Sequence, residues 1–160
     1  MKPSNESAGG ERVALFPGSF RPFTAGHASV VERGLALFDR IVIAVGVNAS
    51  KDVDGSAGAE AAEAIAALYE GNEKVSVVCY TGLTVDAARA AGAQFLLRGV
   101  RSVKDFEYER DMADMNRKLS GLETVLLYSL PELSALSSSV VRELAGYGVD
   151  VSPFLPKKIN

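Results

Sequence analysis

Hydrophobic positions along the chain gather into five short apolar runs, which stretches of helical character separate. The runs are Val13–Phe16, Ile41–Val47, Val75–Cys79, Phe95–Leu97 and Thr124–Tyr128. Each run is too short for a buried helix and shows little polar alternation, which is typical of a strand covered on both faces. The pattern therefore predicts five buried strands.

Helix signals occupy the stretches between the runs. After the first run, apolar residues recur at helical spacing and predict a helix that ends near Asp39–Arg40; they are Val30, Val31, Leu35 and Phe38. Further helices are predicted over 60–69, 84–91, 102–120 and 137–145. Thr84 and Ser102 are expected to cap two of them, and Gly92 and Gly121 to end them.

Strands that alternate with helices indicate an α/β protein with a parallel sheet. We predict a doubly wound, five-stranded, Rossmann-like sheet with right-handed crossovers. Residues 1–11 read MKPSNESAGGE, lack an apolar core and are expected to form a disordered tail. No repeat or linker divides the rest, so residues 12–160 are predicted to form a single domain.

Composition narrows the classes of function. The 160 residues suit one core, and no apolar run approaches the roughly 20 residues that cross a bilayer. A net charge of −3 argues against a nucleic-acid binder, because no basic surface dominates. The lone cysteine, Cys79, excludes an internal disulfide and is interpreted as a core thiol of a cytoplasmic protein.

Polar clusters follow four of the predicted strands. They occupy residues 17–27, 48–52, 98–101 and 129–139. Parallel strands end at one edge of the sheet, and ligands bind there, where the strand order reverses. We therefore expect the four clusters to form one composite site.

The first cluster reads PGSFRPFTAGH and joins the first strand to a helix. Such a junction suits a phosphate, because the first helical N–H groups have no partner within the helix. Ser19 adds a hydroxyl, Gly26 lets the backbone approach a ligand, and His27 is the only histidine in the chain. A lone histidine is often a helix cap or a core residue, and that alternative stays open here.

Three further features fit an anionic ligand. Two arginines flank Gly99-Val100 at the end of a buried strand, and arginine presents a fork that suits phosphate oxygens. The serines at 137–139 precede a helix, where they can cap it, cradle an anion, or do both. Lys51 lies in the loop after the second strand, although most loop lysines are simply solvated.

These motifs resemble a known family. The TAGH segment after PGSF resembles the signature of the nucleotidylyltransferase superfamily, and RGVR with DFEYE at 105–109 resembles the bacterial phosphopantetheine adenylyltransferases. The resemblance runs from Arg12 to about Pro156. It implies a Rossmann-like nucleotidylyltransferase fold that transfers an adenylyl group from ATP to 4′-phosphopantetheine. The products would be dephospho-coenzyme A, in coenzyme A biosynthesis, and pyrophosphate.

The resemblance also implies roles for single residues. Catalytic roles fall on Ser19, His27, Lys51 and Arg101. Contacts with ATP fall on Ser19, Phe20, Gly26, His27, Gly99, Val100, Arg101, Glu109, Ser137, Ser138 and Ser139. Contacts with phosphopantetheine fall on Ser19, Lys51, Leu83, Thr84 and Arg98. Mg²⁺ bound mainly through ATP phosphates, with no protein metal site, a homohexamer and feedback by coenzyme A are implied as well.

Three features depart from the family pattern. Arg21 replaces an aspartate, Leu133 stands where many members have tryptophan, and residues 52–63 lack the usual proline, aromatic residue and Glu-Arg pair. Two other functions remain alternatives. The chain could be a nucleotidylyltransferase that uses CTP or another phosphorylated acceptor, or a nucleotide- or coenzyme A-binding protein that has lost catalysis.

Overall fold

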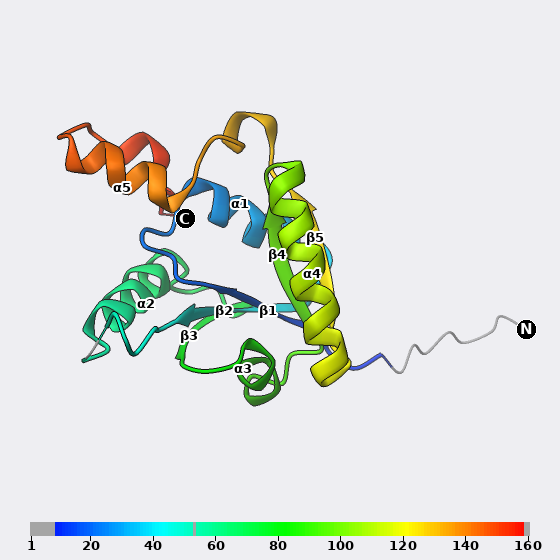
Figure 1. Cartoon of the computed structure of the whole chain (residues 1–160). Coiled ribbons are helices and arrows are strands. Elements are labelled where there is room, and N and C mark those ends of the chain that lie inside the picture. Colours follow the sequence, from blue (N-terminus) through cyan, green and yellow to red (C-terminus); the bar gives the residue numbers. More distant parts are fainter. Residues whose placement is uncertain (1–8, 53, 159–160) are drawn as a thin grey trace, which may run out of the picture.

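A parallel sheet forms the centre of the molecule (Figure 1). The structure, a computed structural model, describes residues 9–52 and 54–158. The strands are β1 (Val13–Gly18), β2 (Arg40–Gly46), β3 (Val75–Tyr80), β4 (Phe95–Val100) and β5 (Glu123–Tyr128). Their order across the sheet is β3-β2-β1-β4-β5. Most of the tail predicted over 1–11 lies outside the described residues, and residues 9–11 are exposed.

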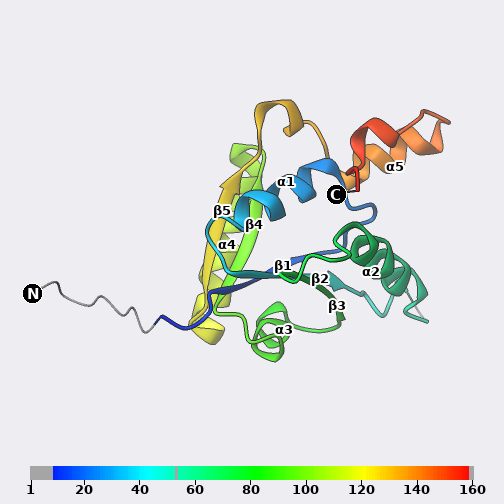
Figure 2. The ribbon, with the colours of Figure 1, turned by 180° about the vertical axis from the view of Figure 1, so that it is seen from behind.

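Helices cover both faces of this sheet. They are α1 (Ala25–Gly34), α2 (Ser56–Leu68), α3 (Thr84–Ala90), α4 (Val103–Ser120) and α5 (Ser138–Gly146), with 3₁₀ turns η1 (Pro131–Leu133) and η2 (Ser152–Phe154). Figures 1 and 2 show α1 and α2 on one face and α3 and α4 on the other. The doubly wound prediction is confirmed. In the described part of the chain, no helix has both the length and the apolar character that a membrane crossing requires.

Two apolar cores lie on the two faces of the central strands. Phe16 and Ile43 pack toward α1 and α2, whereas their chain neighbours Leu15, Val42 and Ala44 pack toward α3. Leu15 pairs with Val42 on one side, so β1 and β2 are in register across the centre of the sheet. Burial on both faces explains why these strands read as continuous apolar runs.

The strand order places a crevice beside β1. The chain builds β1, β2 and β3 outward to one edge, and then returns to add β4 and β5 on the other side of β1. The order therefore reverses between β1 and β4, whose carboxyl ends are Gly18 and Val100. Helices that follow these strands leave the sheet in opposite directions, which opens a crevice at this point.

Two element ends differ from the prediction. Helix α1 ends at Gly34, not near residues 39–40, and Phe38 reaches the core from the turn that follows. Strand β4 continues past Leu97 to Val100, because its ladder with β5 extends as far as the pair Val100–Tyr128. Arg98 and Gly99 therefore lie within the strand rather than in a loop after it.

Two helix starts also differ from the prediction. Helix α2 begins at Ser56, four residues before the predicted start. Leu83 rather than Thr84 occupies the N-cap position of α3, without a side-chain capping bond, and the Thr84 hydroxyl lies 3.0 Å from the Tyr80 hydroxyl. By contrast, Ser102 caps α4 as predicted.

Cys79 is exposed, so its interpretation as a core thiol is wrong. The apolar run that contains Cys79 forms β3, which lies at an edge of the sheet. An edge strand is covered less completely than a central one. The Cys79 thiol lies 3.5 Å from the carbonyl oxygen of Gly58, to which it can donate a weak hydrogen bond.

Candidate active site

A cleft of about 250 Å³ opens at the crevice between β1 and β4, beside the N-termini of α1 and α5. Most of the residues predicted to contact ATP line it: Ser19, Phe20, Gly26, His27, Gly99, Arg101, Ser137 and Ser138. Three of the four predicted clusters thus meet in one place, as the parallel topology requires.

A second cleft, of about 320 Å³, adjoins the first. Ser19 and Arg98 line both clefts, together with Pro17 and Gly18. Thr84 and Glu109 line the second cleft and not the first. The sequence resemblance assigned Glu109 to the nucleotide, and in the structure Glu109 lines the cleft where Thr84 lies. Two ligands, one in each cleft, would meet at Ser19 and Arg98.

His27 is held by a reciprocal cap at the start of α1. The backbone N–H of Thr24 donates to Nδ1 of His27 at 2.9 Å, and the N–H of His27 donates to the Thr24 hydroxyl at 3.4 Å. Because Nδ1 accepts a hydrogen bond, the proton of the neutral ring lies on Nε2. The structural and functional interpretations of this histidine are therefore compatible: the ring caps the helix and leaves Nε2–H as a donor.

The surroundings of His27 favour its neutral form. The rings of Phe20 and Phe23 lie 5.0 and 5.4 Å from the imidazole, between centroids. Burial lowers the pKa of His27 to about 4, and the positive charges of Arg98 and Arg101 contribute to the shift. At neutral pH His27 is thus an uncharged hydrogen-bond donor.

Phe20 fixes the loop that carries Ser19. It adopts a φ of 49°, in the left-handed region that non-glycine residues seldom occupy. Its buried ring packs edge-on against Phe16 and Phe23, with centroids 5.2 Å away in both cases. A Cβ at Gly18 would meet this ring at 2.8 Å, so glycine is needed there for the ring to sit against the end of β1. Aromatic packing stabilises the strained backbone beside the cleft.

Arg98 is fixed by a two-pronged ion pair with Glu109. Its Nε and Nη2 donate to the two carboxylate oxygens at 2.9 and 2.6 Å, and Nη1 donates to the carbonyl oxygen of Pro17 at 2.5 Å. Burial disfavours the charge of Arg98, but its hydrogen bonds to Glu109 and the charge of that carboxylate outweigh burial and raise the pKa. Both terminal nitrogens keep one further N–H for a ligand.

Arg101 and α5 complete the first cleft. Arg101 pairs with Asp105 at 3.2 Å and donates to the carbonyl oxygen of Leu136, just before α5. Ser137 caps α5 by accepting from the N–H of Val140 at 3.1 Å. The Ser138 hydroxyl donates to the carbonyl oxygen of Pro22 at 2.8 Å, which joins α5 to the loop after β1.

Four predicted residues lie outside the lining of the two clefts. Val100 is buried within β4, and Ser139 accepts a hydrogen bond from Arg142 at 3.4 Å. Leu83 is exposed at the cap of α3, next to Thr84. Lys51 is exposed too, and its backbone N–H donates to the carbonyl oxygen of Asn48, which lines the second cleft.

Sequence reasoning missed residues that line the clefts. Tyr108, Met112 and Asn116 of α4 line the second cleft, and their spacing of four places them on one helix face. That spacing was readable in the sequence beside Glu109. Thr24 was missed as well, because its capping partner is a histidine and not the usual Glu or Gln.

The donor set of the first cleft suits phosphates better than a bare cation. Hydroxyls, a neutral imidazole, guanidinium groups and two helix N-termini line it. Among residues 9–52 and 54–158, no three His, Cys, Asp or Glu side chains are grouped so that they could hold a metal ion.

Comparison with known proteins identifies the family of the chain. The family model described as cytidylyltransferase-like matches residues 15–144. Phosphopantetheine adenylyltransferases from Porphyromonas gingivalis and Bacteroides thetaiotaomicron are 53% and 49% identical to the chain, over 92% and 91% of it and 95% and 96% of their own lengths.

A solved structure shows the same fold at low sequence identity. A Vibrio parahaemolyticus protein assigned as a nicotinate-nucleotide adenylyltransferase superposes with a TM-score of 0.62 at 18% identity, over 92% of this chain and 95% of its own. That likeness concerns the fold alone. Sequence identity of about half over nearly the whole length, together with the family match, establishes the relationship: the chain belongs to the phosphopantetheine adenylyltransferase family of nucleotidylyltransferases.

Proposed function

We propose that this chain transfers the adenylyl group of ATP to 4′-phosphopantetheine, yielding dephospho-coenzyme A and pyrophosphate. One observation carries the proposal: two clefts adjoin at Ser19 and Arg98, and His27 lines only the first. A reaction between two phosphorylated substrates needs such a junction. The family relationship supplies the identity of the two substrates.

The reaction needs no catalytic base, because the attacking group is already a phosphate anion. A new bond forms between an oxygen of that phosphate and the α-phosphorus of ATP, and the bond to pyrophosphate breaks. Negative charge grows on the oxygens of the α-phosphate and of the leaving pyrophosphate. Catalysis then consists of positioning and electrostatic stabilisation.

His27 donates from Nε2 to an α-phosphate oxygen in the transition state. The low pKa of His27, about 4, supports this role. A neutral imidazole can donate a hydrogen bond without forming an ion pair that would retain the leaving pyrophosphate. Arg101 and the α5 serines bind the β- and γ-phosphates, where a helix N-terminus favours negative charge. Ser19 and Lys51 bind the attacking phosphate and the α-phosphate.

Arg98 binds on the phosphopantetheine side and is oriented by Glu109. The two-pronged pair supports this division, because Glu109 lines the second cleft and reaches Arg98 through both oxygens. Mg²⁺ would be held mainly by the ATP phosphates, where it would lower the repulsion between phosphate oxygens. The hydroxyl-rich lining and the lack of a carboxylate cluster among the described residues fit a cation held by the nucleotide.

The cellular setting also stays a prediction. A homohexamer and inhibition by coenzyme A are expected only from the sequence resemblance. A cytoplasmic location fits the lone Cys79, because a chain with one cysteine forms no internal disulfide.

A substrate panel tests the proposal against its alternatives. Pyrophosphate release is measured with ATP or CTP and with 4′-phosphopantetheine, another phosphorylated acceptor or none. We expect release only with ATP and phosphopantetheine together. Faster release with CTP or with another acceptor would identify a different transferase. Tight nucleotide binding without release from any pair would support the binding-protein alternative.

A further inference from the structure

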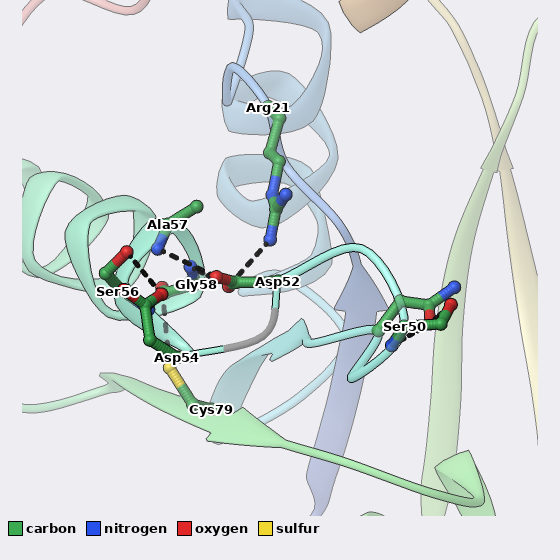
Figure 3. A network of polar contacts seen from close by, with 9 residues as sticks. Arg21, Ser50, Asp52, Asp54, Ser56, Ala57, Gly58 and Cys79 are labelled. Atoms are coloured by element: carbon green, nitrogen blue, oxygen red, sulfur yellow. Dashed lines mark hydrogen bonds and ion pairs between the residues drawn. The ribbon is translucent and has the colours of Figure 1, made fainter.

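Two loops that flank the clefts are joined by an ion pair between a buried carboxylate and an arginine side chain that is 33% exposed (Figure 3). Arg21, in the loop after β1, donates from Nη2 to the Asp52 carboxylate at 3.2 Å. Asp52 follows β2, and its side chain is only 3% exposed. Both positions lie in stretches that depart from the family pattern, and neither residue lines one of the two clefts.

Asp52 also binds the first turn of α2. Its carboxylate accepts from the N–H of Gly58 at 2.9 Å and from the N–H of Ala57 at 3.4 Å. A buried carboxylate is costly unless charge and hydrogen bonds compensate it. Here a helix N-terminus and a guanidinium supply both, which also accounts for the early start of α2.

The position of Asp52 constrains its neighbour Lys51. The backbone N–H groups of Lys51 and Asp52 both donate to the carbonyl oxygen of Asn48 at 2.9 Å. Asn48 itself lines the second cleft. The backbone of Lys51 is thus held between a cleft residue and a buried anchor, while its side chain remains exposed.

The other end of the pair is tied to the first cleft. The carbonyl oxygen of Arg21 accepts from Arg142 of α5, and that of Pro22 accepts from Ser138 at 2.8 Å. Ser19 lies two residues before Arg21. The ion pair therefore connects the segment that carries Ser19 to the segment that carries Lys51.

We propose that Arg21 and Asp52 are positioning residues whose ion pair sets the Lys51 loop relative to the Ser19 loop. The pair lets the Lys51 ammonium reach the phosphates that meet at Ser19. This inference rests on the proposed function. It assigns to Arg21 and Asp52, which lie where the sequence departs from the family pattern, the role of positioning the Lys51 loop.

Three variants test the pair. Arg21→Gln removes the positive charge at this position and leaves Asp52 bound to α2, whereas Arg21→Lys keeps the positive charge. Arg89→Gln breaks an exposed ion pair on α3, with side chains 69% and 62% exposed, and serves as the control. We expect Arg21→Gln to lower kcat about tenfold or more, the scale of a slightly misplaced catalytic group. Arg21→Lys should recover most of the rate, and Arg89→Gln should match the unchanged protein.

A second background separates positioning from a general effect on folding. If Arg21 acts through Lys51, Arg21→Gln should lower kcat little further in a Lys51→Ala protein, since the two changes remove one contribution. Independent, multiplying losses in the double variant would overturn the proposal. So would an unchanged kcat in Arg21→Gln.

Amide exchange tests, without any assay of activity, whether the ion pair restrains the Lys51 loop. Arg21→Gln should speed exchange in peptides spanning 48–58, and Arg89→Gln should not. Unchanged exchange in Arg21→Gln would overturn the inference even if the enzyme assay succeeds. If the unaltered protein releases no pyrophosphate, the proposed function fails. The exchange result then still shows whether the ion pair restrains the Lys51 loop.

Discussion

At the scale of single residues, His27 combines a structural task with a chemical one. The Thr24 N–H, which donates to Nδ1 of His27 at 2.9 Å within the cap of α1, also decides which ring nitrogen carries the proton. Phe20 and Phe23 exclude water from the ring, and two arginines oppose its protonation. A charged imidazole here would lose the Thr24 bond, because Nδ1 would become a donor.

The pKa of His27 is directly measurable, because the chain has no other histidine. An NMR titration should show one imidazole that titrates near pH 4, well below the pKa of 6.5 of an unperturbed histidine. Because the pKa of His27 is lower in the folded chain than in the unfolded one, its contribution to the free energy of unfolding is fully present above pH 6.5. This contribution is lost as the pH falls from 6.5 through about 4. A titration midpoint near 6.5 would contradict the buried, neutral ring.

The Arg98–Glu109 pair predicts a cost in stability. Glu109→Gln leaves the guanidinium without its counter-charge, and the free energy of unfolding should fall by about 2 kcal/mol. This value is below that of a fully buried pair because the Arg98 side chain keeps 30% of its exposure. Urea unfolding measures the loss. Glu107→Gln, an exposed change on the same helix, is the control, and equal stabilities for both variants would contradict the account.

At the scale of elements, the sequence located every strand but not every end. Strand β1 and, after Arg40, strand β2 read as continuous apolar runs because both faces are covered, so they were easy to locate. The end of β4 was missed because Arg98 interrupts the apolar run, and only its long-range partner Glu109 makes a charge acceptable there. Helix α1 ends at Gly34, which packs closely against Leu97 and Ile41, and local spacing does not encode such a contact.

That close packing predicts an asymmetry between two glycines. A Cβ at Gly34 would lie 2.8 Å from Leu97 and 2.9 Å from Ile41, whereas one at Gly146 in α5 would meet nothing within 4 Å. Gly34→Ala should lower the free energy of unfolding by about 1–3 kcal/mol through overpacking. Gly146→Ala should leave it unchanged or raise it slightly, because alanine favours the helix. Thermal unfolding of both variants decides, and a stable Gly34→Ala protein would contradict the packing.

At the scale of the whole molecule, topology explains why the site was foreseeable in part. Clusters far apart in the sequence converge because β1 and β4 end side by side at the reversal of strand order. The α4 residues of the second cleft and the Arg21–Asp52 pair were not foreseen. Arg21 and Asp52 are 31 positions apart, and nothing in their local sequence announces that they meet.

Binding of both substrates should reduce the motion of the loop after β2. If Lys51 moves onto the phosphates, amide exchange across 48–58 should slow when ATP and phosphopantetheine analogues are bound together. The turn at residues 70–74 supplies an internal reference, because it lies outside both clefts and should exchange as before. Unchanged exchange across 48–58 would argue against closure of this loop over the substrates.

The most direct test compares the unaltered protein with His27→Ala in one assay of pyrophosphate release, and measures ATP affinity by calorimetry alongside. The account predicts release that requires phosphopantetheine, and a loss of kcat of at least about a hundredfold in His27→Ala. ATP affinity should change little, because the Nε2 bond forms mainly in the transition state. Release that persists in His27→Ala, or a loss confined to ATP affinity, would contradict the central role of this histidine.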